Sequence, residues 1–181
     1  MMYLDPEHPH RVLMLCYYYP PLRSSGTIRS LAFSRLLPQF GWTPVVLTVA
    51  NPRPSWITVE QTPSEHEDCE VHRSTELNLF GLVNFLHGVC CRIARLFGRE
   101  LQINYFAELL CIPDAEIAWL TTPRGLALAK SCELIYVSCS PFSASLSGCI
   151  LKLLTGKPLV LDFRDAWTLN PHIKHARLHR A

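Results

Sequence analysis

The chain has 181 residues, of which 49% are hydrophobic and 18% charged, so we expect one folded domain and exclude an intrinsically disordered protein. Seventeen Lys and Arg against fifteen Asp and Glu give a net charge of +2, too even a balance for the concentrated basic face of a nucleic-acid-binding protein. The mean hydropathy of +0.13 favours an exposed apolar surface that meets a membrane or a partner.

Residues 1–10 are polar and acidic and lack the basic stretch and apolar core of a secretory signal. We expect this segment to be disordered and the chain to be cytoplasmic, either free or peripheral on the inner face of the membrane. In a reducing compartment the eight cysteines would stay unpaired, and most of them are expected to be small buried hydrophobes.

The chain then opens with a predicted strand, helix and strand. Arg11–Tyr17 is a nearly continuous apolar run, which is typical of a strand buried on both faces, and Pro44–Ala50 repeats this pattern. Between them a helical pattern begins at Thr27. Its apolar residues share one face and are expected to be buried: Ile28, Leu31, Ala32 and Leu36. Such a unit implies parallel pairing of the two strands with a right-handed crossover.

The rest of the chain continues the alternation of strands and helices. Further strands are predicted at Cys69–Ser74, Leu134–Cys139 and Lys157–Asp165. Further helices are predicted at Arg99–Cys111, Thr122–Lys130 and Ser143–Leu154. This spacing predicts an α/β fold with a doubly wound, mostly parallel Rossmann-like sheet.

One more helix, predicted at residues 77–97, has the length of a membrane span but carries polar and basic side chains, among them Arg92 and Arg95. Centring such groups in hydrocarbon is costly, which argues against a true span. The polar groups line up along one side and leave a wide apolar face. This pattern fits either a helix in the core or a helix lying in a membrane interface.

Ligands of a doubly wound sheet bind outside the carboxyl ends of its strands, so three loops are candidate sites. In the first loop, Ser24, Ser25 and Gly26 precede a helix N-terminus that can bind an anion, and Gly26 would let the backbone approach a ligand. Arg29 follows in the first turn, where the helix dipole disfavours a cation unless an anion lies nearby. Alternatively, Ser24 or Ser25 caps the helix and Arg29 is solvated.

The other two loops follow later strands. In the middle loop, Ser140 and Ser143 come just before a predicted helix, and Ser143 is expected to cap it. In the last loop, Asp162, Arg164 and Asp165 end the strand, and charges at this density need partners. Either a structural Asp–Arg pair locks the strand end, or Arg164 or Asp165 points into the cleft.

The last residues of the chain carry His172, His175 and His179 at helical spacing. No second cluster of ligands supports a metal site there. We therefore expect a solvated tail and no bound metal or cofactor.

Taken in order, these segments resemble the N-terminal domain of family 4 glycosyltransferases, which are retaining enzymes of the GT-B fold. The first stretch is RVLMLCYYYPPLRSSGTIRSLAFSRLLPQFGWTPVVLTV, which is similar to the opening strand and Pro-Pro…Gly-Gly loop of the family. IPDAEIAW and SCSPFSASLSGCILKLLTGKP are similar to its Pro-Asp…Trp turn and serine-proline strand end. LVLDFRDAW is similar to its Asp-Phe-Arg-Asp-x-Trp strand end.

The resemblance implies an acceptor-side domain over residues 11–170, a tail at 171–181, and a C-terminal donor-binding domain or partner chain that completes the site. The implied residues at the donor phosphates and acceptor are Ser24, Ser25, Gly26 and Arg29, with Ser140 and Ser143 on the acceptor side and Arg164 and Asp165 at the reaction centre. The sequence departs from the family at Ser24-Ser25-Gly26, where a glycine pair is usual, and at Ser145, where a histidine is common.

The implied reaction transfers a sugar, with retention, from a nucleoside-diphosphate sugar to a cell-envelope polysaccharide or glycolipid. No metal is implied, since a helix N-terminus and cationic side chains can neutralise a diphosphate. Two alternatives stay open: a non-catalytic, membrane-docking half of a two-chain glycosyltransferase, and half of a sugar-nucleotide epimerase. Taken alone, the chain is not expected to turn over.

Overall fold

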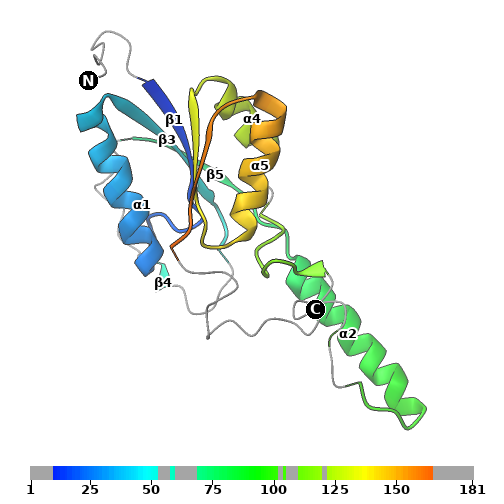
Figure 1. Cartoon of the computed structure of the whole chain (residues 1–181). Helices are drawn as coiled ribbons and strands as arrows, with labels where there is room; N and C mark the ends of the chain where they lie inside the picture. The colour runs from blue at the N-terminus through cyan, green and yellow to red at the C-terminus, as the bar shows by residue number, and fades with distance from the viewer. Residues whose placement is uncertain are drawn as a thin grey trace.

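A computed structural model describes residues 10–52, 58–59, 69–101, 104, 110–119 and 122–164 of the chain. Its centre is a five-stranded parallel sheet in the order β5-β3-β1-β6-β7 (Figure 1). The strands are β1 (His10–Leu15), β3 (Trp42–Val49), β5 (Glu70–Ser74), β6 (Leu134–Ser138) and β7 (Leu159–Asp162). The predicted Rossmann-like α/β fold is confirmed, and each of the five predicted strands is present.

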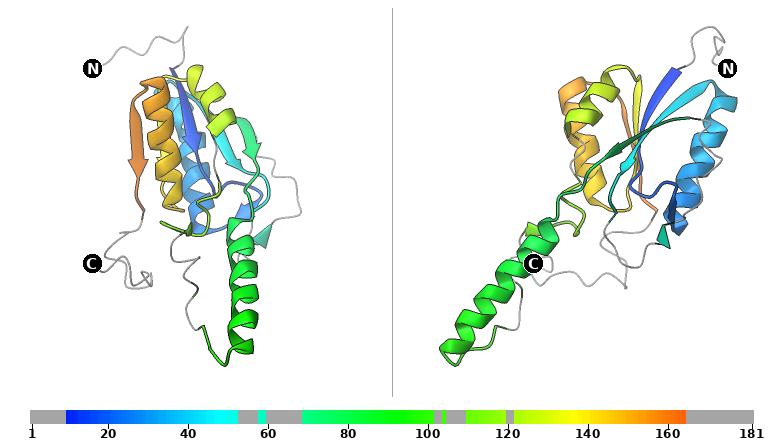
Figure 2. Two further views of the ribbon diagram at one scale, coloured as in Figure 1. Left: turned by 90° about the vertical axis from the view of Figure 1, so that its right-hand side faces the viewer. Right: turned by 180° about the vertical axis from the view of Figure 1, so that it is seen from behind.

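Helices cover both faces of this sheet (Figure 2). α1 (Ser25–Leu36), followed by the 3₁₀ turn η1 (Leu37–Phe40), lies on one face. α4 (Thr122–Lys130) and α5 (Ser143–Thr155) lie on the other. A short antiparallel pair, β2 (Leu22–Arg23) and β4 (Thr58–Val59), is separate from the main sheet.

The central strand is apolar at successive positions because both of its faces are buried. Along β1, Leu13 and Leu15 belong to the core below α4 and α5, whereas Val12 and Met14 belong to the core below α1. These four side chains are at most 1% exposed. Burial on both faces thus explains the uninterrupted apolar run that predicts this strand.

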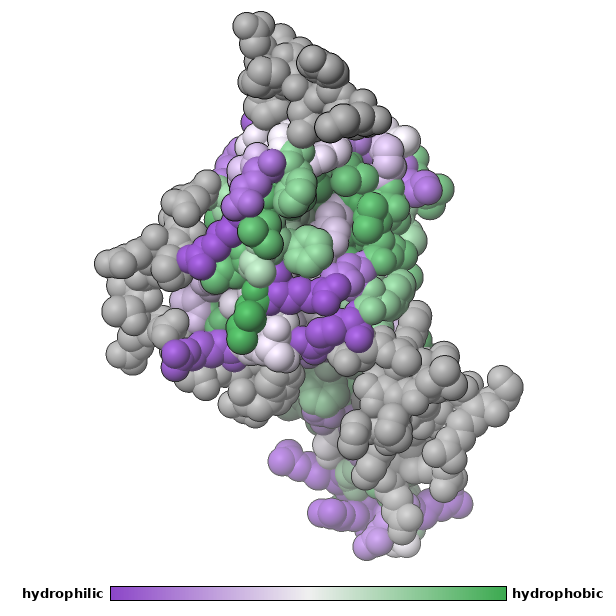
Figure 3. All heavy atoms as spheres, turned by 60° about the vertical axis from the view of Figure 1, so that its left-hand side comes forward, coloured by the Kyte–Doolittle hydropathy of each residue, from purple (hydrophilic) through white to green (hydrophobic). Residues whose placement is uncertain are grey.

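The orientation of α1 differs from the prediction. Ile28 is 73% and Leu36 is 50% exposed, and the surface on this side of the molecule carries apolar patches between charged groups (Figure 3). The buried residues of α1 are small: Gly26, Thr27, Ser30 and Ser34. Ser34 faces a core that contains the large rings of Tyr19 and Tyr136, since the Tyr19 hydroxyl hydrogen-bonds to Ser34 Oγ at 2.9 Å, and Gly26 lies against Tyr18. Of the predicted apolar face, Leu31 alone packs partly against this core.

α2 (Leu79–Leu96) projects away from the sheet, as Figures 1 and 2 show. The predicted helix is confirmed, but the alternative that places it in the core is wrong, since Val83 is its one buried residue. Within the described residues, α2 is also the one helix that is long and apolar enough to cross a membrane by length and composition.

The eight cysteines all lie in the described part of the chain, and each is a free thiol. Cys16, Cys132 and Cys139 are buried, and Cys149 is exposed. The other four are half-buried, so the expected full burial is found for three cysteines rather than for most.

Some predicted segments lie at the edge of the described residues or outside them. His10 begins β1, so the N-terminal segment is shorter than predicted by at least this residue. Residues 1–9, Asp165 and residues 171–181 with their three histidines lie outside the described residues, as does most of the helix predicted at Arg99–Cys111.

Candidate functional site

The carboxyl edge of the sheet contains a topological switch point between β1 and β6. The chain leaves β1 for α1 on one face and leaves β6 for α5 on the other, so the starts of these two helices diverge there. Open α/β sheets bind ligands at such points. The three predicted loops reach this edge, because they precede α1, precede α5 and follow β7.

The start of α1 is shaped by one serine and one glycine. Ser24 caps the helix, since its Oγ accepts a hydrogen bond from the Thr27 N–H at 3.2 Å, which confirms one of the two predicted caps. Gly26 lies against Tyr18: a Cβ on this glycine would lie 3.0 Å from Tyr18 Cδ2 and 3.2 Å from Tyr18 Cβ. The close approach of α1 to the segment after β1 therefore explains this glycine without a ligand.

Arg29 finds its anion within the chain. Its Nε and Nη2 donate to the two carboxylate oxygens of Asp162 at 2.7 and 2.8 Å, and the Tyr136 hydroxyl donates to the same carboxylate at 2.6 Å. Burial acts to raise the pKa of Asp162, but the hydrogen bonds from Arg29 and Tyr136 outweigh it, so the pKa lies below its usual value. A structural Asp–Arg pair thus locks the strand end, with Arg29 as the arginine.

Arg164 joins the last predicted loop to the first. Its Nη1 donates to Ser25 Oγ at 3.0 Å, a contact between residues 139 positions apart. With the Arg29–Asp162 pair, this contact holds the end of β7 against the start of α1. The residues that the structure brings together here are Ser24, Ser25, Gly26, Arg29 and Arg164.

The start of α5 is capped by a distant carboxylate. Its N-cap residue, Phe142, makes no side-chain capping bond, and the Ser143 N–H donates to Asp114 Oδ2 at 2.9 Å. The prediction that Ser143 caps this helix is wrong, because Ser143 is already the first helical residue and the Asp114 carboxylate takes the capping position. Ser140 is half-buried in the same loop, and its N–H donates to the Ser138 carbonyl at 2.9 Å.

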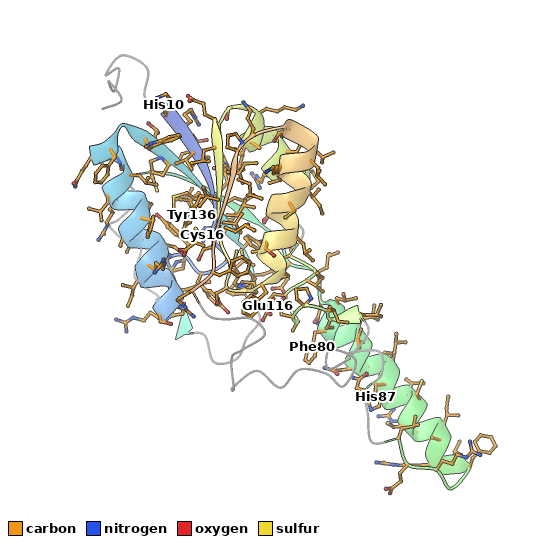
Figure 4. All side chains as sticks on the ribbon, in the orientation of Figure 1. His10, Cys16, Phe80, His87, Glu116 and Tyr136 are labelled. Atoms are coloured by element: carbon orange, nitrogen blue, oxygen red, sulfur yellow. The ribbon has the colours of Figure 1, made fainter. Side chains whose placement is uncertain are left out.

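Three carboxylates that were not among the predicted site residues contribute to this edge: Glu76, Asp114 and Glu116. Figure 4 labels Glu116. Glu76 is 3% exposed and accepts a hydrogen bond from the Tyr17 hydroxyl at 2.7 Å. Burial, assisted by the neighbouring Asp114, raises the pKa of Glu116 to about 7, and burial also raises the pKa of Asp114. Glu116 can therefore hold or release a proton near neutral pH.

The Tyr18 hydroxyl is influenced by both the acidic and the basic groups of this edge. Burial has the largest effect and raises the pKa of its hydroxyl; Glu116, Asp114 and Glu76 act in the same direction, and Arg164 opposes them. All four charged groups are thus close enough to one phenol to influence it. The edge offers hydroxyl, cationic and acidic groups to a polar ligand.

A sequence signal existed for some of these groups. Asp114 and Glu116 stand two residues apart in the IPDAEIAW segment that carries part of the resemblance. Glu76 had no such signal, because only the tertiary structure brings it to Tyr17, 59 residues away. In the part of the chain that the structure describes, no group of three His, Cys, Asp or Glu side chains is arranged to hold a metal ion.

Comparisons of the chain with protein-family models, with curated proteins and with solved structures found no match. The fold defines the class: this is a Rossmann-like, parallel α/β protein. Its candidate site is the carboxyl edge between β1 and β6, bordered by the starts of α1 and α5.

Proposed function

We propose that the chain is the acceptor-side, N-terminal domain of a glycosyltransferase that moves a sugar from a nucleoside-diphosphate sugar to a cell-envelope polysaccharide or glycolipid. The observation that carries the proposal is the contact between Arg164 and Ser25. It joins two of the stretches that resemble family 4 glycosyltransferases at the edge of a parallel sheet where α/β proteins bind their ligands.

In this proposal the start of α1 faces the donor diphosphate. Backbone N–H groups at a helix N-terminus attract anions, and Arg164 adds a positive charge beside Ser25. Arg29 acts as a positioning residue, because its bond to Asp162 holds the end of β7 and thereby places Arg164 two residues further on. Asp165, which the resemblance assigns to the reaction centre, stays a prediction.

The acidic side of the edge suits the acceptor. Sugar hydroxyls donate hydrogen bonds to carboxylates. Asp114 accepts a hydrogen bond from the Ser143 N–H at the start of α5, and its charge acts on Glu116. A carboxyl group with a pKa of about 7 can also accept the proton that an acceptor hydroxyl releases when the glycosyl group is transferred to it.

In this proposal the domain supplies one half of the glycosyltransferase active site. The other donor contacts would come from a C-terminal domain or a partner chain, so the chain alone should bind a nucleotide sugar weakly. Calorimetric titration with UDP-glucose and with GDP-mannose should give dissociation constants of about 1 mM or weaker. Micromolar affinity for either would contradict the division of the site between two domains.

Transfer is tested on the chain purified with its C-terminal domain or donor-binding partner. Arg164→Ala should reduce transfer of radiolabelled sugar to extracted glycan and lipid acceptors by about 100-fold, or roughly 2.7 kcal/mol in the barrier, because it removes charge stabilisation beside the diphosphate. Asp165→Asn is measured in the same assay. Arg35→Ala, in the last turn of α1, should transfer at the wild-type rate.

The outcomes separate the proposal from its alternatives. Equal transfer by the Arg164 and Arg35 variants would exclude Arg164 from the site. Interconversion of nucleotide sugars without transfer would favour an epimerase. A complex whose transfer depends wholly on residues of the second chain would favour a non-catalytic docking half.

A further inference from the structure

The side of α2 that is opposite its polar residues is a continuous apolar surface. Six side chains at helical spacing form this surface, which we call the α2 apolar face: Leu82, Phe85, Leu86, Val89, Ile93 and Leu96. Each is between 36% and 83% exposed. Most of the stability of a helix in a protein comes from packing of its apolar face, so a surface that covers this face would also stabilise α2, which has one buried residue.

The chain that follows α2 does not cover this face where the structure describes it. Asn104 Nδ2 donates to Asn84 Oδ1 at 2.8 Å, and the Cys91 thiol donates to the Leu101 carbonyl at 3.7 Å. Asn84 and Cys91 belong to the polar side of the helix, roughly opposite the α2 apolar face. These bonds hold the described part of the returning segment against the polar side, while Arg99 and Leu101 also line a hollow with Ile93 at one edge of the apolar face. The rest of the apolar face stays exposed.

The charge of this region favours an anionic partner. Residues 77–99 contain no Asp or Glu, and Arg92, Arg95 and Arg99 stand at the far end of α2. Arg92 borders the apolar face, and Arg95 lies further round on the polar side of the helix. A basic rim beside a wide apolar face is the pattern of helices that lie in the headgroup region of anionic membranes.

We propose that α2 docks this protein on an anionic lipid bilayer, lying in the plane of the interface with the α2 apolar face toward the acyl chains and Arg92 and Arg95 at the headgroups. A spanning orientation is disfavoured, because it would place Asn84 and His87 in the middle of the hydrocarbon.

The place where α2 joins the sheet domain determines where the candidate site lies when α2 is docked on a bilayer. The Asn51 side chain holds the segment just before α2 through two bonds: its Nδ2 donates to the Glu76 carbonyl at 3.1 Å, and its Oδ1 accepts from the Glu76 N–H at 2.8 Å. Asn51 follows β3, so α2 leaves the domain at the carboxyl edge of the sheet (Figure 1). A docked α2 therefore holds the candidate site on the side of the molecule that is near the bilayer.

Vesicle binding tests the docking. The full chain should sediment with vesicles of phosphatidylcholine that contain phosphatidylglycerol and should bind pure phosphatidylcholine far less. Salt at 0.5 M should release it, because the Debye length falls from about 10 Å at 0.1 M to about 4 Å at 0.5 M and screens the arginines from the headgroups. Arg92→Gln combined with Arg95→Gln should weaken binding about 30-fold, since each arginine near an anionic surface contributes about fivefold. Arg35→Gln, on α1, should bind as the wild type.

The apolar face is tested by a matched pair of variants. Leu86→Glu with Ile93→Glu should abolish sedimentation without lowering the melting temperature, because both side chains are exposed. Leu153→Glu, at an exposed leucine of α5 that is 84% exposed, should leave sedimentation unchanged. Equal loss by the α2 and α5 variants would overturn the assignment of the docking surface to α2.

The orientation of the helix is tested by quenching of tryptophan fluorescence in brominated lipid. Leu86→Trp should be quenched strongly, and Gly88→Trp, on the opposite side of α2 where an added side chain meets nothing within 4 Å, should be quenched weakly. Equal quenching of the two, with binding that resists salt and alkaline carbonate, would show a spanning helix and overturn the proposal. The proposal would also be overturned if the chain did not bind vesicles and instead formed a dimer that the Leu86→Glu substitution dissociates.

Discussion

Arg29 stands near the start of α1, where the helix dipole disfavours a positive charge by about 0.3–1 kcal/mol. The bidentate contact with Asp162 offsets this cost, and the guanidinium carbon also lies 5.5 Å from the ring centre of Phe33. The same contact ties β7 to α1. A residue that the sequence marks as a candidate for ligand binding therefore has a structural role that requires no ligand.

Removal of this pair should lower stability modestly. Arg29→Ala should reduce the free energy of unfolding by roughly 1 kcal/mol, because the Arg29 side chain is 44% exposed and solvent screens the pair. Asp162→Asn should have a similar cost, and the double variant should cost less than the sum. Urea unfolding of the wild type and the three variants measures this coupling.

The stabilisation that the Arg29–Asp162 pair gives the fold should decrease at low pH. The pKa of Asp162 lies below its usual 3.8 in the folded protein, so the stabilisation is present at neutral pH and is lost as the pH falls below that value. Additive costs at neutral pH would show that the pair does not stabilise the fold.

Glu116 should make stability depend on pH in the opposite sense. Its carboxyl ionises near pH 4.5 in an unfolded chain and near pH 7 in the folded protein, mainly because of burial. The folded state therefore holds the extra proton between these values, and the free energy of unfolding should fall as the pH rises from about 4.5 to about 7. The full stabilisation is present below pH 4.5.

Glu116→Gln should flatten this part of the stability profile, which corresponds to a change of up to about 3 kcal/mol for a shift of this size. Urea unfolding at several pH values between 5 and 8 checks the result. Glu100→Gln, at an exposed position after α2, is the control and should keep the wild-type profile. Parallel profiles for wild type and Glu116→Gln would contradict the buried state of this carboxyl.

At the scale of elements, α5 approaches the sheet closely at one glycine. A Cβ on Gly148 would lie 2.6 Å from Val137 Cγ2 and 3.2 Å from Leu159 Cδ1, so Gly148→Ala should lower the free energy of unfolding by about 1–3 kcal/mol.

Gly88, in α2, is the contrasting position, because a Cβ added there meets nothing within 4 Å. Gly88→Ala should raise helix content, since alanine is favoured over glycine in a helix by about 1 kcal/mol. Thermal unfolding followed by circular dichroism distinguishes the two; a destabilised Gly88→Ala would mean that α2 packs against a further surface.

At the scale of the whole molecule, the sheet domain and the projecting α2 should differ in local stability. With Val83 as its one buried residue, α2 should open without unfolding of the sheet. Trypsin should therefore cleave after Arg92 and Arg95 before it cleaves after Arg11 and Arg73, which lie in β1 and β5. Mass spectrometry of the early fragments checks the order, and simultaneous cleavage at both pairs would show that α2 and the sheet unfold together.

The sequence by itself determined the order of strands and helices, the parallel α/β class and the cap at Ser24. These features depend on neighbours in the chain: buried parallel strands are continuous apolar runs, and a serine at the start of a helix bonds to an N–H three residues on. The sequence also located the three loops of the candidate site, since the carboxyl ends of parallel strands meet at one edge whatever the side chains are.

Only the tertiary structure decided which groups those loops bind and which helix faces are buried. Arg29 meets Asp162 across 133 residues, and the cap of α5 comes from Asp114, 29 residues before it. α1 buries its small residues because the tyrosine rings of β6 and of the segment after β1 lie below it, and α2 is exposed because it leaves the domain altogether. Periodicity along one segment identifies an apolar face, but the element that packs against this face, if there is one, is set by residues far away in the chain.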